Sequence, residues 1–180
     1  MPANDQPPIA EIDRSSPAAC VEALAPLFEG APRFLARLCA ARPFGDRPTL
    51  FATARRIARS MPEADQLELI DAHPRLGAPA ATVSDMSFVE QGYDRAVEDP
   101  AAADAEIERR RLASELERLN TAYEDRFAFR YCVFVAGRSR AELLPGFEAA
   151  LAAERGAEIA RALDAVVDIA QDRWATRGGE

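Results

Sequence analysis

Apolar residues recur at intervals of three and four over most of the chain, which is the period of an amphipathic α-helix. The stretch SSPAACVEALAPLFEG, residues 15–30, shows the whole pattern. Ser16 can accept from the free amides of a first turn, Pro17 suits the first helical position, and Gly30 can take the left-handed conformation that ends a helix. The sequence therefore predicts a helix that begins after Ser16.

The same start and stop signals recur farther along the chain, and each set marks a further helix. These helices are expected over residues 31–41, 46–61, 62–72, 84–91, 100–127, 139–154 and 156–177. In the longest of them, an apolar stripe from Ile107 to Tyr123 is expected to face a core. Pro145 predicts either a kink in the helix over 139–154 or a late start for it.

One segment departs from the helical period. Residues 127–137, FAFRYCVFVAG, are rich in aromatic and β-branched side chains, which is typical of a buried strand. A lone strand has no pairing partner, so we expect an extended or helical segment in the core whose backbone amides need other partners. We predict an all-α, single-domain bundle of about eight helices over residues 15–180, after a flexible, proline-rich lead-in of residues 1–14.

Charge and composition narrow the choice of partners. The 180 residues carry 22 Lys and Arg against 30 Asp and Glu, a net charge of −8. We therefore expect no binding to nucleic acid or to membranes, and the sequence has no apolar run of membrane-spanning length. The beginning lacks a secretory pattern and the end, RGGE, lacks a peroxisomal S-K-L address, so a cytoplasmic, bacterial-type protein is expected.

The inventory of reactive residues excludes several chemistries. Cys20, Cys39 and Cys132 are odd in number and far apart, so we expect reduced thiols that act as small buried hydrophobic side chains. Metal-site spacings, a nucleotide-phosphate loop, a G-x-S-x-G elbow and a dinucleotide fingerprint are all missing from the sequence. Acid–base catalysis without metal or cofactor remains, as does the absence of any catalysis.

His73, the single histidine, lies in LIDAHPRLG at the expected end of a helix. Its ordinary pKa, about 6.5, suits proton transfer near neutral pH. On composition alone, a polar group that bonds the last carbonyls of the helix is the favoured interpretation. Farther on, SDMSFVEQ places Ser87, Glu90 and Gln91 on one face of a short helix, where they can hold a small polar molecule or simply face solvent.

Four blocks in order, AHPRLG, SFVEQ, LNTAYEDRFAFRYCVFVAGRS and ALDAVVDIAQDR, extend over about 105 residues. Together they are specific, and through them the chain resembles the 2-oxo-4-hydroxy-4-carboxy-5-ureidoimidazoline (OHCU) decarboxylases of urate degradation. The resemblance implies an all-α fold and cofactor-free conversion of OHCU to (S)-allantoin. It makes His73 the catalytic proton donor and Glu90 its carboxylate partner.

The resemblance also implies which residues contact the small-molecule substrate. These residues are Pro74, Ser87, Phe88, Val89, Glu90, Gln91, Phe127, Ala128, Phe129, Arg130, Tyr131 and Arg173. For Arg173, an ion pair with Asp168 or Asp172 is an equally weighted alternative. The family also implies a homodimer and functional association with other urate-pathway enzymes.

The chain departs from the family pattern in one block, because FAFRY stands where F-G-F-P-F is expected. Ala128 excludes the most extreme glycine conformations, and Arg130 restores an amide that proline lacks. Arg130 either adds a positive charge at the rim of the pocket or points to solvent. This departure leaves open a second function, a helical binding or scaffold module without activity.

The chemistry agrees with the decarboxylase. Loss of CO2 leaves a carbanion, so the site needs donors for the neighbouring carbonyl and one acid on one face of the ring. Glu90 can accept from substrate and favour a charged His73, while Ser87 and Gln91 orient the ureido and imidazolone groups. A third function, a hydrolase in which His73 activates Cys132, requires a reactive and accessible thiol.

Overall fold

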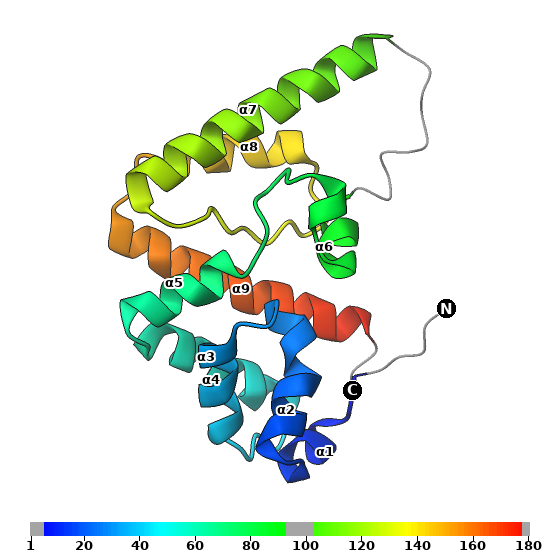
Figure 1. The fold of residues 1–180 in the computed structure, drawn as a ribbon, viewed down its shortest axis with the longest axis vertical. Coiled ribbons are helices and arrows are strands. Elements are labelled where there is room, and N and C mark those ends of the chain that lie inside the picture. Colours follow the sequence, from blue (N-terminus) through cyan, green and yellow to red (C-terminus); the bar gives the residue numbers. More distant parts are fainter. Residues whose placement is uncertain (1–5, 93–102, 178–180) are drawn as a thin grey trace. The chain divides into compact units, whose positions relative to one another are not determined.

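Helices are the regular elements of this protein in the computed structural model, which describes residues 6–92 and 103–177 (Figure 1). The α-helices are α1 Ile9–Arg14, α2 Pro17–Leu24, α3 Pro32–Ala40, α4 Arg47–Ser60, α5 Glu63–Asp71, α6 Asp85–Glu90, α7 Ala103–Phe127, α8 Arg140–Ala150 and α9 Arg155–Thr176, and the 3₁₀ turns are η1 Ala25–Phe28 and η2 Ala80–Thr82. The all-α prediction is confirmed for the described residues.

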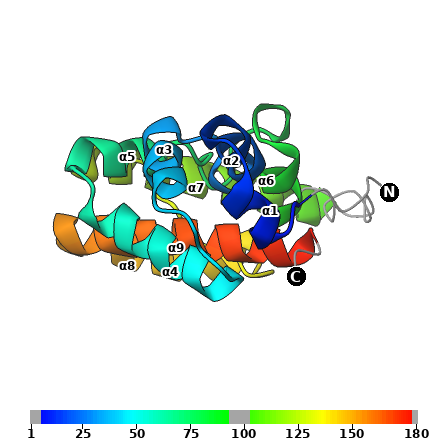
Figure 2. The same ribbon diagram turned by 90° about the horizontal axis from the view of Figure 1, so that it is seen from below.

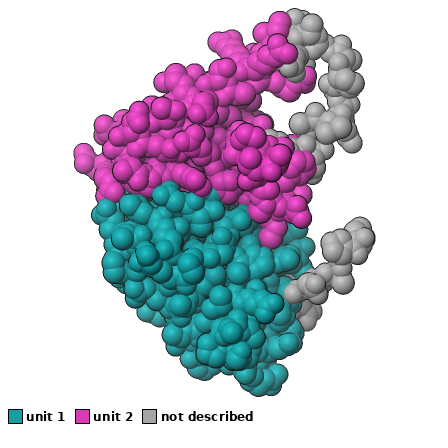
Figure 3. Space-filling model, in the orientation of Figure 1, with its two compact units in different colours: residues 1–73, 159–180 teal, residues 74–158 magenta. Residues whose placement is uncertain are grey.

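The chain divides into two compact units, coloured separately in Figure 3. Unit 1 consists of residues 1–73 and 159–180, and unit 2 consists of residues 74–158. Unit 1 therefore holds α1 to α5 and most of α9, whereas unit 2 holds α6, α7 and α8. The boundary after His73 divides the HPRLG motif between the two units.

Local capping signals start the helices of unit 1 where the sequence predicts them. The Ser16 hydroxyl accepts from the Ala19 amide at 3.2 Å, and the Asp46 carboxylate accepts from the Thr49 amide at 2.8 Å. Each cap satisfies an amide that has no partner within its helix. Gly30 adopts the expected positive φ of 76° after the turn η1.

Packing within unit 1 joins its early helices to α9. Figure 2 shows α4 and α9 side by side, and the Arg55 guanidinium of α4 bridges Asp164 at 2.9 Å and Asp168 at 2.7 Å on α9. Phe51 meets the fully buried Trp174 edge to face, with ring centroids 6.1 Å apart. Apolar contact and charge pairing therefore stabilise the same helix pair.

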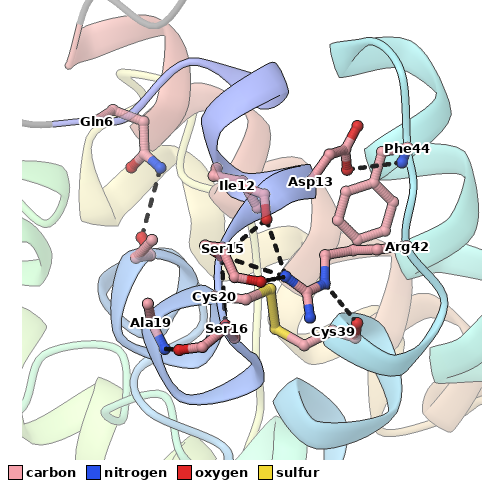
Figure 4. The surroundings of a disulfide bond; sticks show 11 residues. Gln6, Ile12, Asp13, Ser15, Ser16, Ala19, Cys20, Cys39, Arg42 and Phe44 are labelled. Atoms are coloured by element: carbon pink, nitrogen blue, oxygen red, sulfur yellow. Dashed lines mark hydrogen bonds between the residues drawn. A yellow bond between two sulfur atoms is a disulfide. The ribbon is translucent and has the colours of Figure 1, made fainter.

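The structure corrects two predictions in unit 1. Residues 9–14, which the sequence placed in a flexible lead-in, form α1, because Ile9 and Ile12 are both buried. Cys20 and Cys39 are not reduced thiols but a disulfide that links α2 to α3 (Figure 4). The bond forms because α2 and α3 pack against each other. This packing depends on the fold, so the spacing of 19 residues in the sequence did not indicate it.

Hydrogen bonds between side chains and backbone groups surround the disulfide (Figure 4). The Arg42 guanidinium donates to the carbonyl oxygens of Cys39 at 2.7 Å, Ile12 at 2.9 Å and Ser15 at 2.6 Å. These three carbonyls come from the ends of α1 and α3 and the link into α2. One side chain therefore joins the three helices that surround the disulfide.

In unit 2, the expected stripe on α7 is buried only in its C-terminal half. Leu116, Leu119 and Tyr123 are at most 2% exposed, whereas Ile107 is 63% exposed. The prediction for Ile107 is therefore wrong, because packing covers only the end of α7 that lies against α8. Pro145 lies inside α8, which begins at Arg140 behind a Ser139–Glu142 capping box, so the late start is excluded.

Candidate active site

His73 lies two residues after the end of α5 and is 3% exposed. Its Nδ1 lies 3.2 Å from the carbonyl oxygen of Leu69, one turn earlier in the chain. A carbonyl oxygen can only accept, so Nδ1 carries the hydrogen and the neutral ring has its lone pair on Nε2. The expectation that His73 bonds the last carbonyls of its helix is confirmed.

Burial determines the protonation state of His73. Loss of hydration, and then the positive charge of Arg173, lower the pKa of His73 from 6.5 to about 4, while Glu29 and the bond to Leu69 act in the opposite direction. At neutral pH the resting imidazole is therefore uncharged. It is a proton acceptor before it can be a proton donor.

Arg173 of α9 is buried in unit 1 with its charge paired. Its Nη2 donates to Glu29 Oε1 at 2.8 Å, and its Nη1 donates to the carbonyl oxygen of Pro26 at 3.0 Å. Where the sequence left open an ion pair with Asp168 or Asp172, Arg173 pairs with Glu29, and Asp168 pairs with Arg55. The sequence did not single out Glu29, because its partner lies 144 residues away.

The loop that follows His73 is anchored within unit 2. Asn120 Nδ2 donates to the carbonyl oxygen of Leu76 at 3.0 Å, and Arg75 Nε donates to Glu124 Oε1 at 2.7 Å. Gly77 adopts φ 81°, and a side chain there would place its Cβ 2.9 Å from Leu116 Cδ1. Contacts to α7 therefore fix the residues after Pro74.

Gln91 uses its side-chain amide to hold the same loop. Its Oε1 accepts from the Gly77 amide at 2.8 Å, and its Nε2 donates to the carbonyl oxygen of Arg75 at 3.2 Å. Arg140 in turn donates to the backbone oxygen of Gln91 at 3.3 Å. In this structure Gln91 positions the loop, a role that the sequence did not suggest.

The remaining candidates on α6 have different exposures. Ser87 is 2% exposed, Phe88 and Glu90 are partly exposed, and Val89 is 50% exposed. The Ser84 hydroxyl caps the helix by accepting from the Ser87 amide at 3.2 Å. The Gln91 amide donates to the Ser87 carbonyl at 3.0 Å, which places these two residues one turn apart as predicted.

Phe127 ends α7, residues 128 and 129 form a bend, and buried and exposed side chains alternate from Phe127 to Tyr131. Phe127, Phe129 and Tyr131 are at most 4% exposed, whereas Ala128 and Arg130 are exposed. The buried rings surround Tyr123, with centroids 4.6, 5.5 and 5.2 Å from its own. After Phe127 the segment is neither helix nor strand, so the helical alternative is excluded for residues 128–131, and the exposure of Arg130 is compatible with both of its expected positions.

Backbone contacts fix the start of this segment. Ala128 adopts a φ of 62°, and its amide donates to the carbonyl oxygen of Glu124 at 2.8 Å. The Arg155 guanidinium donates to the carbonyl oxygen of Phe127 at 3.0 Å. An alanine therefore occupies the left-handed conformation for which the family pattern has glycine, at a cost of about 1 kcal/mol.

The structure brings together His73, Arg173 and Glu29 in unit 1, and the 75–77 loop and Gln91 in unit 2.

Cys132 is 4% exposed, which counts against its role as a hydrolase nucleophile. Among the described side chains, no group of three His, Cys, Asp or Glu residues could hold a metal ion. The helices within the described ranges are too short or too polar to cross a membrane.

Comparison with known proteins decides the family. The model of the OHCU decarboxylase family matches residues 13–175. This chain belongs to the OHCU decarboxylase family. It is 27% identical over 169 residues to 2-oxo-4-hydroxy-4-carboxy-5-ureidoimidazoline decarboxylase of Haloferax volcanii, covering 94% of this chain and 95% of that protein.

Further proteins are similar to this chain in sequence or in fold. The chain is 31% identical over 154 residues to the uric acid degradation bifunctional protein PucL of Bacillus subtilis, and this match covers 86% of the chain but 29% of PucL. A crystal structure of OHCU decarboxylase in the presence of (S)-allantoin shares the fold, with a TM-score of 0.61 at 23% identity, covering 82% of this chain and 91% of that one. The fold of (S)-allantoin synthase is similar, with a TM-score of 0.63 at 18% identity, over 95% and 54% of the two chains.

Proposed function

We propose that this carboxy-lyase converts OHCU to (S)-allantoin in urate degradation, with His73 as the group that moves the proton. Family membership over residues 13–175 is the observation that carries the activity. The burial of the single histidine at the end of α5 supports its catalytic role, because buried titratable groups with shifted pKa values cluster at functional sites.

The proton balance explains why a neutral His73 is suitable. When the carboxylate leaves as CO2, the electron pair of the broken C–C bond stays on the imidazoline, and one proton must quench it. Nε2 of resting His73 can accept the proton of the substrate hydroxyl, whose oxygen becomes the new carbonyl, and return that proton to carbon, while one further proton from solvent neutralises the ring nitrogen that takes up the electron pair. Because the bound substrate is negatively charged, it raises the pKa of His73 and favours the protonated form.

The other candidates orient the substrate in this proposal. Glu90 accepts from the substrate hydroxyl or ureido N–H, and the buried Ser87 hydroxyl binds a polar edge of the ring. Arg173 attracts the substrate carboxylate, although its pairing with Glu29 moderates that attraction. Pro74, Phe88, Val89 and the 127–131 segment are the remaining candidates for contact with the substrate.

The activity is tested by generating OHCU from urate and measuring how fast it disappears. The wild type is expected to accelerate its loss well above the buffer rate without any added cofactor, and Glu90→Gln is expected to retain only a small part of this acceleration. Glu148→Gln is the matched control, because it removes an exposed carboxylate in the same unit. A wild-type rate equal to that of buffer would contradict the proposal.

The second candidate function, a binding module without activity, rests on the departure of Ala128 and Arg130 from the family pattern. It predicts tight binding of (S)-allantoin, measured calorimetrically, with no turnover of OHCU. The Ala128 backbone nevertheless adopts the positive φ that a glycine would, so the segment keeps its turn. This favours the active enzyme.

The remaining proposals concern the setting of the reaction. PucL is described as a bifunctional protein of uric acid degradation, which supports association of this chain with neighbouring enzymes of that pathway. Homodimerisation and a cytoplasmic location stay predictions. Val166, Val167 and Ile169, apolar residues of α9, are at most 7% exposed within one chain, so another surface would have to form a dimer.

A further inference from the structure

Arg173 carries a full positive charge in the interior of unit 1. Its side chain is 1% exposed, and that of its partner Glu29 is 14% exposed. A buried guanidinium is costly unless a carboxylate and further acceptors compensate it. Glu29 Oε1 at 2.8 Å and the Pro26 carbonyl oxygen at 3.0 Å provide that compensation from one short segment.

The backbone of this segment is specialised. Glu29 ends the turn η1 with φ 50° and ψ 29°, a left-handed conformation that costs a residue other than glycine about 1 kcal/mol. The next residue, Gly30, also has a positive φ. The turn packs against α2, which the Cys20–Cys39 disulfide links to α3. A strained residue in so constrained a turn suggests that the place of its side chain matters.

Glu29 and Arg173 act on the same group with opposite signs. The positive charge of Arg173 lowers the pKa of His73, and the negative charge of Glu29 raises it. These charges reach His73 from two elements, α9 and the end of η1, and the backbone bond to Leu69 comes from its own helix. Neutralising either partner therefore leaves the charge of the other uncompensated at His73.

We propose that Glu29 is a positioning residue of this active site, which fixes the Arg173 guanidinium and balances its charge for both His73 and the substrate carboxylate. The link to substrate rests on the proposed function. A fully uncompensated arginine would hold the carboxylate tightly in the ground state, which slows the loss of CO2. An arginine whose positive charge is partly balanced by Glu29 still binds the substrate carboxylate, but it holds the carboxylate weakly enough for it to leave as neutral CO2.

The electrostatic part can be measured without any reaction. His73 is the single histidine, so its imidazole gives one titrating NMR signal that needs no assignment. Arg173→Gln is expected to move the midpoint up from about 4 towards 6.5, into an accessible pH range. Adding Glu29→Gln to that variant is expected to move the midpoint down again, because the carboxylate that favours the charged ring is gone.

The matched control is Asp164→Asn in the same Arg173→Gln background. Asp164 is also an arginine-paired carboxylate of unit 1, since it accepts from Arg55 at 2.9 Å. This change is expected to leave the midpoint where Arg173→Gln alone puts it. If Glu29→Gln and Asp164→Asn give the same midpoint, Glu29 does not act on His73 and the inference is wrong. Should Glu29→Gln fail to fold, Glu29→Ser in the same comparison serves as the test.

The kinetic part uses Glu29→Gln alone. Both kcat and KM are expected to fall, kcat by about tenfold or more, because carboxylate binding strengthens while its departure slows. Glu29→Asp, which keeps the charge, is expected to restore part of kcat. A purely structural role predicts a raised KM, or the kcat and KM of wild type once the rate is corrected for the fraction of folded protein. Either result would overturn the proposal. If even the wild type shows no decarboxylation, the proposed function fails, while the midpoints still decide the charge balance.

Discussion

At the scale of single residues, the environment of His73 changes the role that its motif suggests. The resemblance implies a proton donor, whereas burial and Arg173 keep the resting ring neutral. The motif predicts that this histidine matters but carries no information on its charge. The charges that act on it lie far away in the sequence, on residues 29 and 173.

Because the pKa of His73 is low in the folded protein, the free energy of unfolding is expected to depend on pH. Between pH 6.5 and about 4 the unfolded chain binds a proton that the folded chain does not, so the free energy of unfolding falls as the pH drops through this window. The loss is about 3 kcal/mol for His73 by itself. Urea denaturation at pH 7 and pH 4 should show a smaller loss for His73→Asn than for wild type.

The carboxylates of the chain lower the free energy of unfolding at acid pH in wild type and in His73→Asn alike. Their contribution therefore cancels when the two losses are compared. Equal losses of unfolding free energy in wild type and His73→Asn would show that His73 titrates normally in the folded state.

At the scale of elements, the loop after His73 depends on a glycine. Gly77→Ala is expected to destabilise the protein by about 2–3 kcal/mol and to reduce kcat, because its Cβ would lie 2.9 Å from Leu116 Cδ1 at a φ of 81°. Gly45→Ala is the control, since its φ is 79° and nothing lies within 4 Å of its added Cβ. Thermal unfolding of both variants separates the clash from the backbone strain; equal shifts would contradict the contact.

In the segment after α7, a change to glycine is expected to raise the stability of the protein. Ala128→Gly is expected to stabilise the protein by roughly 0.5–1 kcal/mol, because glycine adopts a φ of 62° without steric cost. Ala113→Gly, at an exposed position inside α7, should destabilise by about 1 kcal/mol. Chemical denaturation measures both, and destabilisation by Ala128→Gly would show that the positive φ is not maintained.

Helix starts were predictable because their signals are local. Ser16, Asp46 and Ser139 each cap a helix within three residues of their own position. Arg173 could not be paired correctly from sequence, because its partner Glu29 lies 144 residues away and Asp168, one of the two expected partners, accepts from Arg55. Gln91 was placed on the right face of α6, but its bonds to the 75–77 loop depend on a fold that the pattern does not specify.

At the scale of the whole molecule, the disulfide adds a constraint that the cysteine count did not suggest. A bond across 19 residues is expected to contribute about 3 kcal/mol, or about 6–12 °C in the unfolding midpoint. Reductant should lower the midpoint of wild type but not that of Cys20→Ser/Cys39→Ser. Thiol titration of the unfolded, unreduced chain should find Cys132 alone, and three thiols would contradict the bond.

The central claim is that this chain forms (S)-allantoin through His73. The most direct measurement generates OHCU from urate and follows the circular dichroism of the allantoin produced. Wild type should give the signal of the S enantiomer, and His73→Asn should slow its appearance by about 10²- to 10⁴-fold, towards racemic product from the uncatalysed reaction. Racemic product from wild type, or S product at the wild-type rate from His73→Asn, would contradict the account.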